Sequence, residues 1–194
     1  MRIVRYIGCL IAAALWAQES LEYDLRISYT GDKNAPTTIK TQYCKGTTTK
    51  CGKQIKISHN GVLLFKAYYK NGEYDGEVLS YYPNGTLHES RVYIEGKEIG
   101  KRVTYHRNGK IQSEQMYSLN KREGEGKKYY EDGVLQAHFT FKNDRLDGVR
   151  KEFDKKGILI YETLYKDGKK QSMKQYNTQG EVIESKNCRW QACY

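Results

Sequence analysis

The sequence is poor in proline, in histidine and in long apolar runs. Only 2 of its 194 residues are proline and 4 are histidine. No apolar stretch reaches the roughly 18–20 residues that a membrane-spanning helix needs. The length suits one domain or one elongated array and excludes a large multidomain enzyme. Mixed charge and an aromatic share of 12% argue against a disordered chain.

The first segment has the layout of an export signal. Arg2 and Arg5 precede an apolar run that ends at Ala17 and is followed by polar residues. This order is typical of a secretory signal peptide, and the run is too short to cross a bilayer. We expect cleavage to remove residues 1–17, with cleavage after Ala14 as the alternative and a retained N-terminal helix or anchor as the competing interpretation. The mature chain would then have no transmembrane span and would be periplasmic or secreted.

The cysteines agree with export. One of the five lies in the signal segment, so four would remain in the mature chain. An even number in an oxidising compartment suggests disulfides, and the spacing favours the pairs Cys44–Cys51 and Cys188–Cys193. A zinc site built from both pairs is the alternative. Intervals of six and four intervening residues fit a metal-binding knuckle poorly.

The centre of the chain repeats with a period of 24 residues. Five glycines are spaced by this interval and a sixth follows after 23 residues, at Gly61, Gly85, Gly109, Gly133, Gly157 and Gly180. A period of this length indicates a repeat array. Most of these glycines follow Asn or Asp, and similar pairs such as Asn71-Gly72 mark a second turn in each unit. Asn-Gly and Asp-Gly favour hairpin turns because both central residues can adopt positive φ.

The runs between these turns have the length and composition of strands. They contain about six to nine residues and are rich in Tyr, Val, Ile, Leu and Thr. Two turns per unit leave no window for a helix. We therefore predict an all-β protein, an elongated antiparallel β-meander of about five 24-residue hairpin repeats over residues 59–183. An N-terminal cap (residues 18–58) and a C-terminal cap (residues 184–194) would each be stapled by one disulfide.

Two aromatic columns follow the repeat. The first lies eight residues after each turn glycine, at Tyr69, Tyr93, Tyr117, Phe141 and Tyr165. The second lies twenty residues after it, at Tyr81, Tyr105, Tyr129 and Phe153. Both offsets are even, so alternation along a strand predicts that the two columns share one face. Apolar residues at the seventh position break this alternation and suggest a bulge or a partly two-sided sheet.

The repeated order of tyrosines and glycines carries a family resemblance. Tyr-Tyr-x-x-Gly, then an aliphatic residue, then Tyr-x-x-Gly-x-x-x-Gly resembles the second, bacterial variant of the MORN repeat. Residues 81–87 with 93–100 form the best unit, and residues 129–135 open another. The resemblance covers roughly residues 59–183. It implies a sheet of hairpins that serves as a scaffold for proteins or membrane lipid, and many bacterial relatives are described as antitoxin-like. An export signal and four mature cysteines depart from a cytoplasmic antitoxin.

Catalytic constellations are dispersed by the repeat. His59 and His106 lie two units apart, and so do His88 and His138, which corresponds to about 20 Å along the sheet. That distance is too long for a shared metal or a catalytic triad. The sequence has no nucleophile elbow, no phosphate-binding glycine loop before a helix and no metalloprotease motif. We expect a protein that is not an enzyme and needs no cofactor or metal.

The remaining functional signal is basic. Six cations fall in the second strand of successive units and would form a stripe beside the second aromatic column: Lys101, Arg102, Lys127, Lys128, Arg150 and Lys151. Such a stripe could bind anionic lipid, polysaccharide or an acidic protein. It could equally be a solvated face that keeps the sheet soluble, and nucleic acid is an unlikely partner outside the cell. We expect an exported scaffold for a protein or a cell-envelope component. A toxin-neutralising protein and a binder of anionic surfaces are the alternatives.

Overall fold

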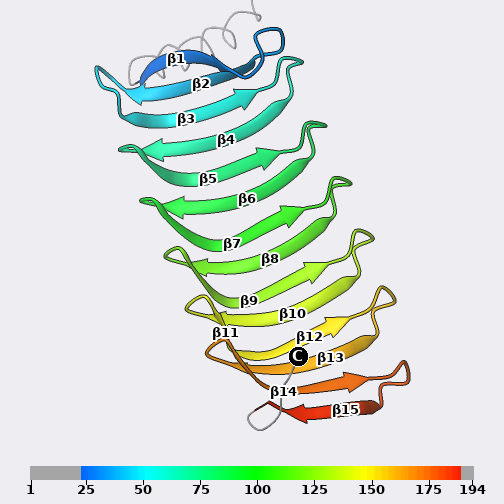
Figure 1. The fold of residues 1–194 in the computed structure, drawn as a ribbon. Helices are drawn as coiled ribbons and strands as arrows, with labels where there is room; N and C mark the ends of the chain where they lie inside the picture. Colours follow the sequence, from blue (N-terminus) through cyan, green and yellow to red (C-terminus); the bar gives the residue numbers. More distant parts are fainter. Residues whose placement is uncertain (1–22, 189–194) are drawn as a thin grey trace, which may run out of the picture.

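The structure, a computed structural model, describes residues 23–188, which form one antiparallel sheet of 15 strands (Figure 1). Neighbours in the chain are neighbours in the sheet, except that the two-residue strand β11 is a side branch that pairs with β10. The predicted all-β meander is confirmed. The proposed signal segment, residues 1–17, and Cys193 lie outside the described residues.

The strands are six to nine residues long apart from β11. The first three are β1 (Tyr23–Thr30), β2 (Thr37–Cys44) and β3 (Lys50–Ile57). The repeats then supply β4 (Leu63–Lys70), β5 (Glu73–Tyr81), β6 (Leu87–Ile94), β7 (Lys97–Tyr105), β8 (Ile111–Ser118), β9 (Lys121–Tyr129), β10 (Leu135–Lys142), β11 (Arg145–Leu146), β12 (Gly148–Phe153), β13 (Leu159–Lys166), β14 (Lys169–Tyr176) and β15 (Val182–Asn187).

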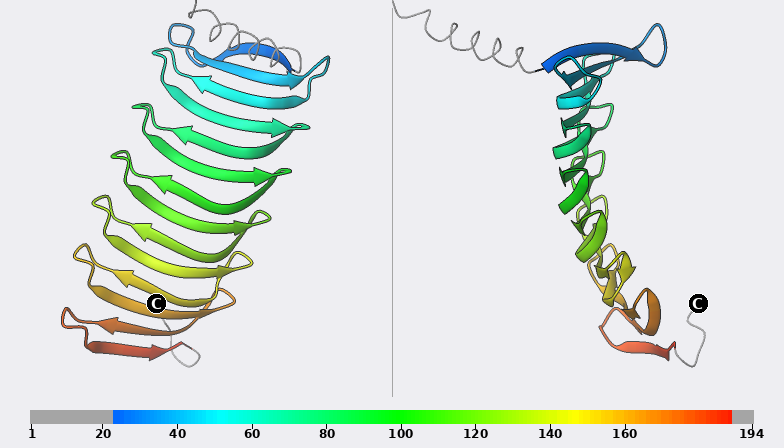
Figure 2. Two further views of the ribbon diagram at one scale, coloured as in Figure 1. Left: turned by 180° about the vertical axis from the view of Figure 1, so that it is seen from behind. Right: turned by 90° about the vertical axis from the view of Figure 1, so that its left-hand side faces the viewer.

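The described residues make a single curved layer. Seen edge-on in Figure 2, the strands lie in one thin sheet, with β1 at one end and β15 at the other. Each unit packs against the units before and after it, as expected of a quasi-one-dimensional array. Both broad faces of the sheet therefore present side chains from every repeat.

The turns within each repeat have the predicted chemistry. Both central residues have positive φ, for example 52° at Asn71 and 87° at Gly72. The turns between repeats differ from the prediction, because only the glycine has positive φ, with values from 80° to 95° at the six turn glycines. Gly85 N donates to Tyr82 O (2.9 Å) and Tyr82 N to Thr86 O (2.8 Å). This pattern fits a type I turn closed by a left-handed glycine.

A bulge after each inter-repeat turn decides which side chains share a face. Leu87 is opposite Tyr81, whereas Glu89 is opposite Ser80, so the residue between them is left without a partner. The extra residue reverses the alternation between Tyr81 and Tyr93, and the two-residue turn at Asn71-Gly72 reverses it between Tyr69 and Tyr81, so the second aromatic column faces away from the first. The prediction that both columns share one face is wrong. The bulge and the two-sided sheet that the sequence suggested are both present.

We name the two surfaces by their cations. The arginine face carries Arg91, Arg102, Arg122 and Arg150 with the first aromatic column, and the lysine face carries Lys101, Lys127 and Lys151 with the second. Among residues 23–188, all the buried residues lie on the arginine face: Thr41, Gln54, Ala67, Val78, Tyr93, Glu98, Gln115, Gly126, Ala137, Phe139 and Thr163. The core of this single layer is therefore one-sided.

Candidate functional site

The predicted basic stripe is split between the two faces. Lys101, Lys127 and Lys151 point to the lysine face, whereas Arg102, Lys128 and Arg150 point to the arginine face. Adjacent residues of a strand point in opposite directions, so each pair of neighbouring cations is divided. A single six-cation stripe is not present in the sheet.

The lysine-face cations are partly neutralised. Lys101 Nζ lies 2.9 Å from Glu114 Oε1, and the same carboxylate accepts a hydrogen bond from Tyr129 (3.0 Å). The hydrogen bond from Lys101 and that from Tyr129 lower the pKa of Glu114. Two repeats later, Glu162 is held in the same way by Lys151 (3.2 Å) and Tyr176 (2.6 Å). Among residues 23–188, Lys127 is the cation of the lysine-face set that forms no ion pair, although its charge helps to lower the pKa of Glu114.

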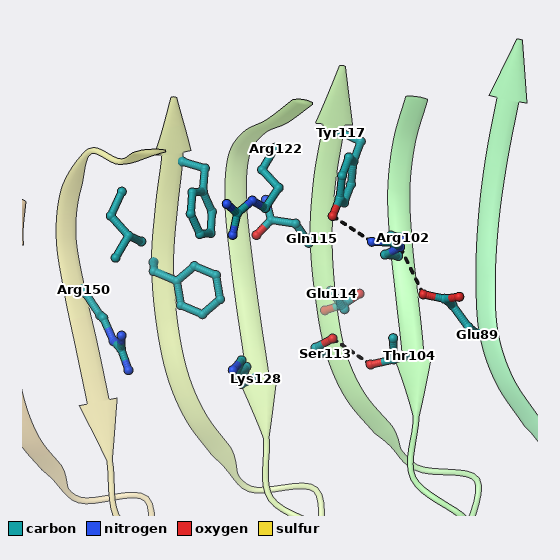
Figure 3. Close-up of a pocket in the computed structure, with 13 residues that line it drawn as sticks. Glu89, Arg102, Thr104, Ser113, Glu114, Gln115, Tyr117, Arg122, Lys128 and Arg150 are labelled. Carbon is teal, nitrogen blue, oxygen red and sulfur yellow. Dashed lines mark hydrogen bonds and ion pairs between the residues drawn. The ribbon is translucent and has the colours of Figure 1, made fainter. Parts of the chain in front are cut away.

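A groove opens on the arginine face across β6 to β12. It has a volume of about 330 Å³ and is open to solvent along one side (Figure 3). Phe139, Phe141 and Leu146 give it an apolar wall, and Tyr117 stands at its edge. Its cationic lining consists of Arg102, Arg122, Lys128 and Arg150. The groove therefore combines apolar surface with four cations from three successive units.

Gln115 and Phe139, two lining residues of the groove, approach each other over Gly126 because this residue has no side chain. The equivalent position is Val78, Arg102 and Arg150 in other repeats. A Cβ atom at Gly126 would overlap the side chains of Gln115 and Phe139, which meet over this glycine. Its φ is not in the positive range, so space and not backbone conformation requires glycine here. The sequence signal for this feature is a glycine at a position where other repeats have valine or arginine. The spacing of the turns and the aromatic columns does not reveal it.

The arginines of the groove are held by acids of the same face. Arg102 Nε lies 3.1 Å from Glu89 and 3.2 Å from Glu98, and its Nη1 donates to the Tyr117 hydroxyl (2.8 Å). Burial raises the pKa of the Glu98 carboxyl, while Arg102 and Arg91 oppose that rise. These contacts hold Arg102 in place, which leaves it little freedom to reorganise around a ligand.

The other two arginines are also engaged. Arg122 pairs with Asp144 (3.2 Å) and lies over the ring of Phe141 at 4.1 Å from its centroid. Arg150 pairs with Glu152 (2.6 Å). The ring faces of the groove are thus occupied by guanidinium groups.

Three polar groups of the groove have no hydrogen-bond or ion-pair partner within residues 23–188. Lys128 has no ion-pair or hydrogen-bond partner among residues 23–188. The Oε1 atom of Gln115, a side chain only 9% exposed, accepts no hydrogen bond, and Arg150 Nε donates none. Buried polar groups normally have partners, so Gln115 Oε1 and Arg150 Nε are unsatisfied atoms in the wall of the groove, whereas Lys128 is exposed and can contact a ligand directly.

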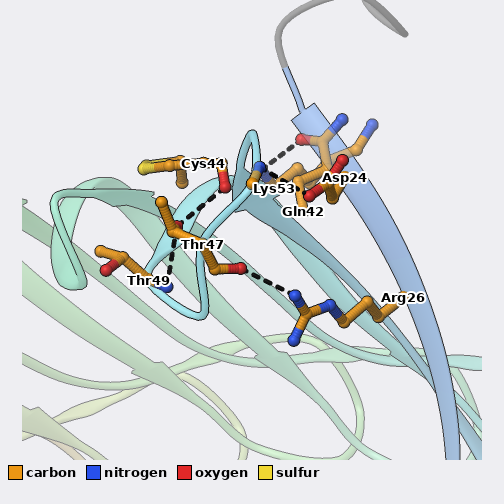
Figure 4. The surroundings of a disulfide bond; sticks show 9 residues. Asp24, Arg26, Gln42, Cys44, Thr47, Thr49 and Lys53 are labelled. Carbon is orange, nitrogen blue, oxygen red and sulfur yellow. Dashed lines mark hydrogen bonds between the residues drawn. A yellow bond between two sulfur atoms is a disulfide. The ribbon is translucent and has the colours of Figure 1, made fainter.

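A disulfide closes the hairpin loop between β2 and β3. Cys44 and Cys51 are bonded, as the sequence predicted, and the zinc alternative is excluded for this pair. Figure 4 shows how the loop is tied to the edge strand, because Arg26 Nη2 donates to Thr47 O (2.7 Å). Cys188 is described, but its predicted partner Cys193 is not, so the second staple stays a prediction.

The histidines do not assemble into a site. Within the part of the chain that the structure describes, no group of three or more His, Cys, Asp or Glu side chains is placed to hold a metal ion. His106 Nε2 lies 3.1 Å from Tyr129 O, and the His88 ring packs against Tyr82 at a tilt of 52°, with ring centroids 4.5 Å apart. These two histidines contact neighbouring repeats and therefore have a structural role.

The fold and its repeated hairpins define a single-layer β-repeat scaffold. A family model described as a MORN repeat variant matches residues 50–71, 74–95, 98–118, 122–143 and 146–167, which is more than half of the chain. The chain belongs to this family, as the resemblance implied, and the match begins in β3, inside the segment predicted as the N-terminal cap. Such repeats suggest a protein that binds proteins or membranes, and the family is generally non-enzymatic. No curated protein matches the sequence. Between residues 23 and 188 there is no helix with the length and apolarity of a membrane span.

Proposed function

We propose that this protein is an exported, non-enzymatic scaffold that binds an acidic, extended segment of a partner protein in the groove of the arginine face. The observation that carries the proposal is the groove of about 330 Å³ with Lys128 unpaired at its centre. Charge complementarity would select the partner and speed its association. The apolar wall would supply the contact area.

The available groups of the groove favour a peptide. An extended peptide offers carbonyl and acidic side-chain oxygens as acceptors for the exposed Lys128. A polysaccharide would need open aromatic faces for stacking, but Phe139 is buried and Arg122 covers Phe141. A membrane surface is flat and would contact a face more readily than a groove.

Export is supported by the bond between Cys44 and Cys51. Disulfides form and persist in oxidising compartments and are rare in the cytosol. The basic start and apolar run of the first 17 residues agree with this location. Intact mass of the protein recovered from the medium or the periplasm, with and without reductant, tests the proposal. A full-length mass with free thiols would refute export.

Neighbouring cations provide matched variants for the binding site. Lys128→Glu reverses a charge in the groove, and Lys127→Glu makes the same change on the opposite face. We expect co-purification of an acidic partner with the wild type and with Lys127→Glu, and its loss with Lys128→Glu. The partner is then identified by mass spectrometry, and its purified form is titrated into each variant by calorimetry. Equal binding by the two variants would refute the groove as the site.

The same pair tests the anionic-surface alternative. Sedimentation with anionic lipid vesicles that Lys127→Glu abolishes and Lys128→Glu leaves intact would place membrane binding on the lysine face. The ion pairs of Lys101 and Lys151 with glutamates argue against this outcome.

A further inference from the structure

The sheet has an unprotected edge at β1. Among the described residues, β1 pairs only with β2, so no strand of residues 23–188 pairs with its outer N–H and C=O groups. Leu25, Ile27 and Tyr29 alternate along this strand and are 60%, 50% and 66% exposed. Because Ile27 is opposite Lys40 and Lys40 is opposite Ile55, these three side chains point to the lysine face. An edge strand that is long and apolar is a template for pairing with another strand.

The other side of β1 is tied to its own chain. Asp24 accepts a hydrogen bond from Gly46 N (2.9 Å), and Arg26 donates to Thr47 O (Figure 4). The guanidinium of Arg26 also lies 4.3 Å from the centroid of the Tyr43 ring. The side chains of Asp24 and Arg26 are therefore held by contacts within the chain, whereas the exposed row of Leu25, Ile27 and Tyr29 is open to a second strand.

The opposite edge is protected. β15 has six residues where β1 has eight, and its Glu184 and Lys186 form an ion pair (3.0 Å). Charged side chains and short length are the usual means by which proteins block edge pairing. The difference between the edges disfavours head-to-tail filaments, which would require β1 to join β15.

We propose that β1 pairs with β1 of a second copy of this chain, antiparallel and centred on Ile27. In this register Ile27 is opposite Ile27, Leu25 is opposite Tyr29 and Arg26 is opposite Ser28 of the second copy. Every residue from 24 to 30 then has a partner, and six apolar side chains form one cluster. Centring the pair on Arg26 would place two like charges in direct opposition. Odd-numbered residues can pair only with odd-numbered residues, and even with even, because paired side chains must point to the same face of the joint sheet.

This pairing joins two copies and no more, because each copy uses its single β1 edge. The result is one continuous sheet across both copies. A two-fold axis normal to the sheet keeps the two arginine faces on the same side. The dimer would present two grooves in one direction, so a partner with two acidic segments would bind with avidity. The pairing itself does not depend on the groove, and Lys128→Glu should leave it unchanged.

The mass of the purified protein in solution tests the proposal. Sedimentation velocity of the wild type should give twice the mass of one chain. Ile27→Lys, which places a charge in the apolar row, should give the mass of one chain. The matched control is Ile183→Lys on β15, a site with similar exposure of 58%, which should remain dimeric. A wild type that is monomeric at every concentration, or an Ile27→Lys variant that stays dimeric, would overturn the proposal.

Cysteine cross-linking tests the register of the pairing. It remains informative even if the Ile27→Lys variant does not fold. Opposed Cα atoms in an antiparallel pair lie about 4.5–5.5 Å apart, a distance suited to a disulfide. Ile27→Cys should therefore form a covalent dimer on mild oxidation. Ser28→Cys should not, because its counterpart in the second copy would lie about 8 Å away. Absence of a covalent dimer from Ile27→Cys, or equal cross-linking of both variants, would exclude this register.

Discussion

Arg102 holds together the most buried charges of the arginine face. It contacts Glu89 and Glu98 and donates to Tyr117, and Glu98 is only 7% exposed. Arg102→Met retains much of the side-chain volume but removes the cation. We expect the free energy of unfolding at neutral pH to fall by about 2 to 3 kcal/mol, which is less than the roughly 3–5 kcal/mol for breaking a fully buried ion pair. The loss is smaller because the Arg102 side chain is 27% exposed and Arg91 remains 3.1 Å from Glu89.

The loss should depend on pH. Burial already raises the pKa of Glu98 above its usual value of 4.5, and removal of Arg102 would raise it further in the folded state. A carboxyl with a raised folded pKa binds its proton more tightly in the folded protein, so its stabilising contribution is present in acid and is lost as pH rises. Arg102→Met should therefore be less destabilising at mildly acidic pH, where Glu98 can be protonated, than at neutral pH.

Urea denaturation at the two pH values measures this difference. Lys101→Met is the matched control, because Lys101 is the adjacent residue, is 54% exposed and makes one ion pair on the opposite face. Its loss should stay below about 1 kcal/mol, as for other surface pairs. Equal losses for the two variants, or a loss from Arg102→Met that does not change with pH, would refute this account of the cluster.

Three further outcomes are expected. Gly126→Val should displace Gln115 and Phe139, which line the groove, and so weaken partner binding in calorimetry and lower stability by about 1 to 3 kcal/mol through overpacking; retained affinity would mean that the ligand lies elsewhere. Tyr130→Phe removes a hydrogen bond of 2.8 Å to Phe153 O in the next repeat and should cost about 1 kcal/mol in denaturation. Replacing Cys44 and Cys51 by serine opens a short loop and should cost about 2 to 3 kcal/mol, a loss that reductant reproduces in the wild type.

The strands and turns could be predicted because their causes are local. The 24-residue spacing of Gly61, Gly85 and the glycines that follow places every inter-repeat turn, and positive φ is a property that glycine supplies without help from its surroundings. The short interval between Cys44 and Cys51 likewise limited that pair to a simple hairpin loop. The N-terminal cap was less evident, because β1 and β2 lack the repeat.

The faces could not be predicted, because one unpaired residue per repeat decides them. The bulge beside Leu87 leaves the spacing of the glycines unchanged but turns the first aromatic column away from the second. Lys127 and Lys128 are adjacent in β9 and point to opposite faces, so simple alternation along the strand divides the predicted stripe. Gly126 can be read from the sequence, but its role in packing depends on Gln115 and Phe139, which approach it from the two neighbouring strands.

The sequence by itself determined the repeat, the hairpins and the first disulfide, since each follows from residues close together in the chain. Only the tertiary structure decided which cations share a surface, which of them acids neutralise, and where a groove opens. Those properties arise from register between strands, and register sums small local irregularities that no single segment reveals.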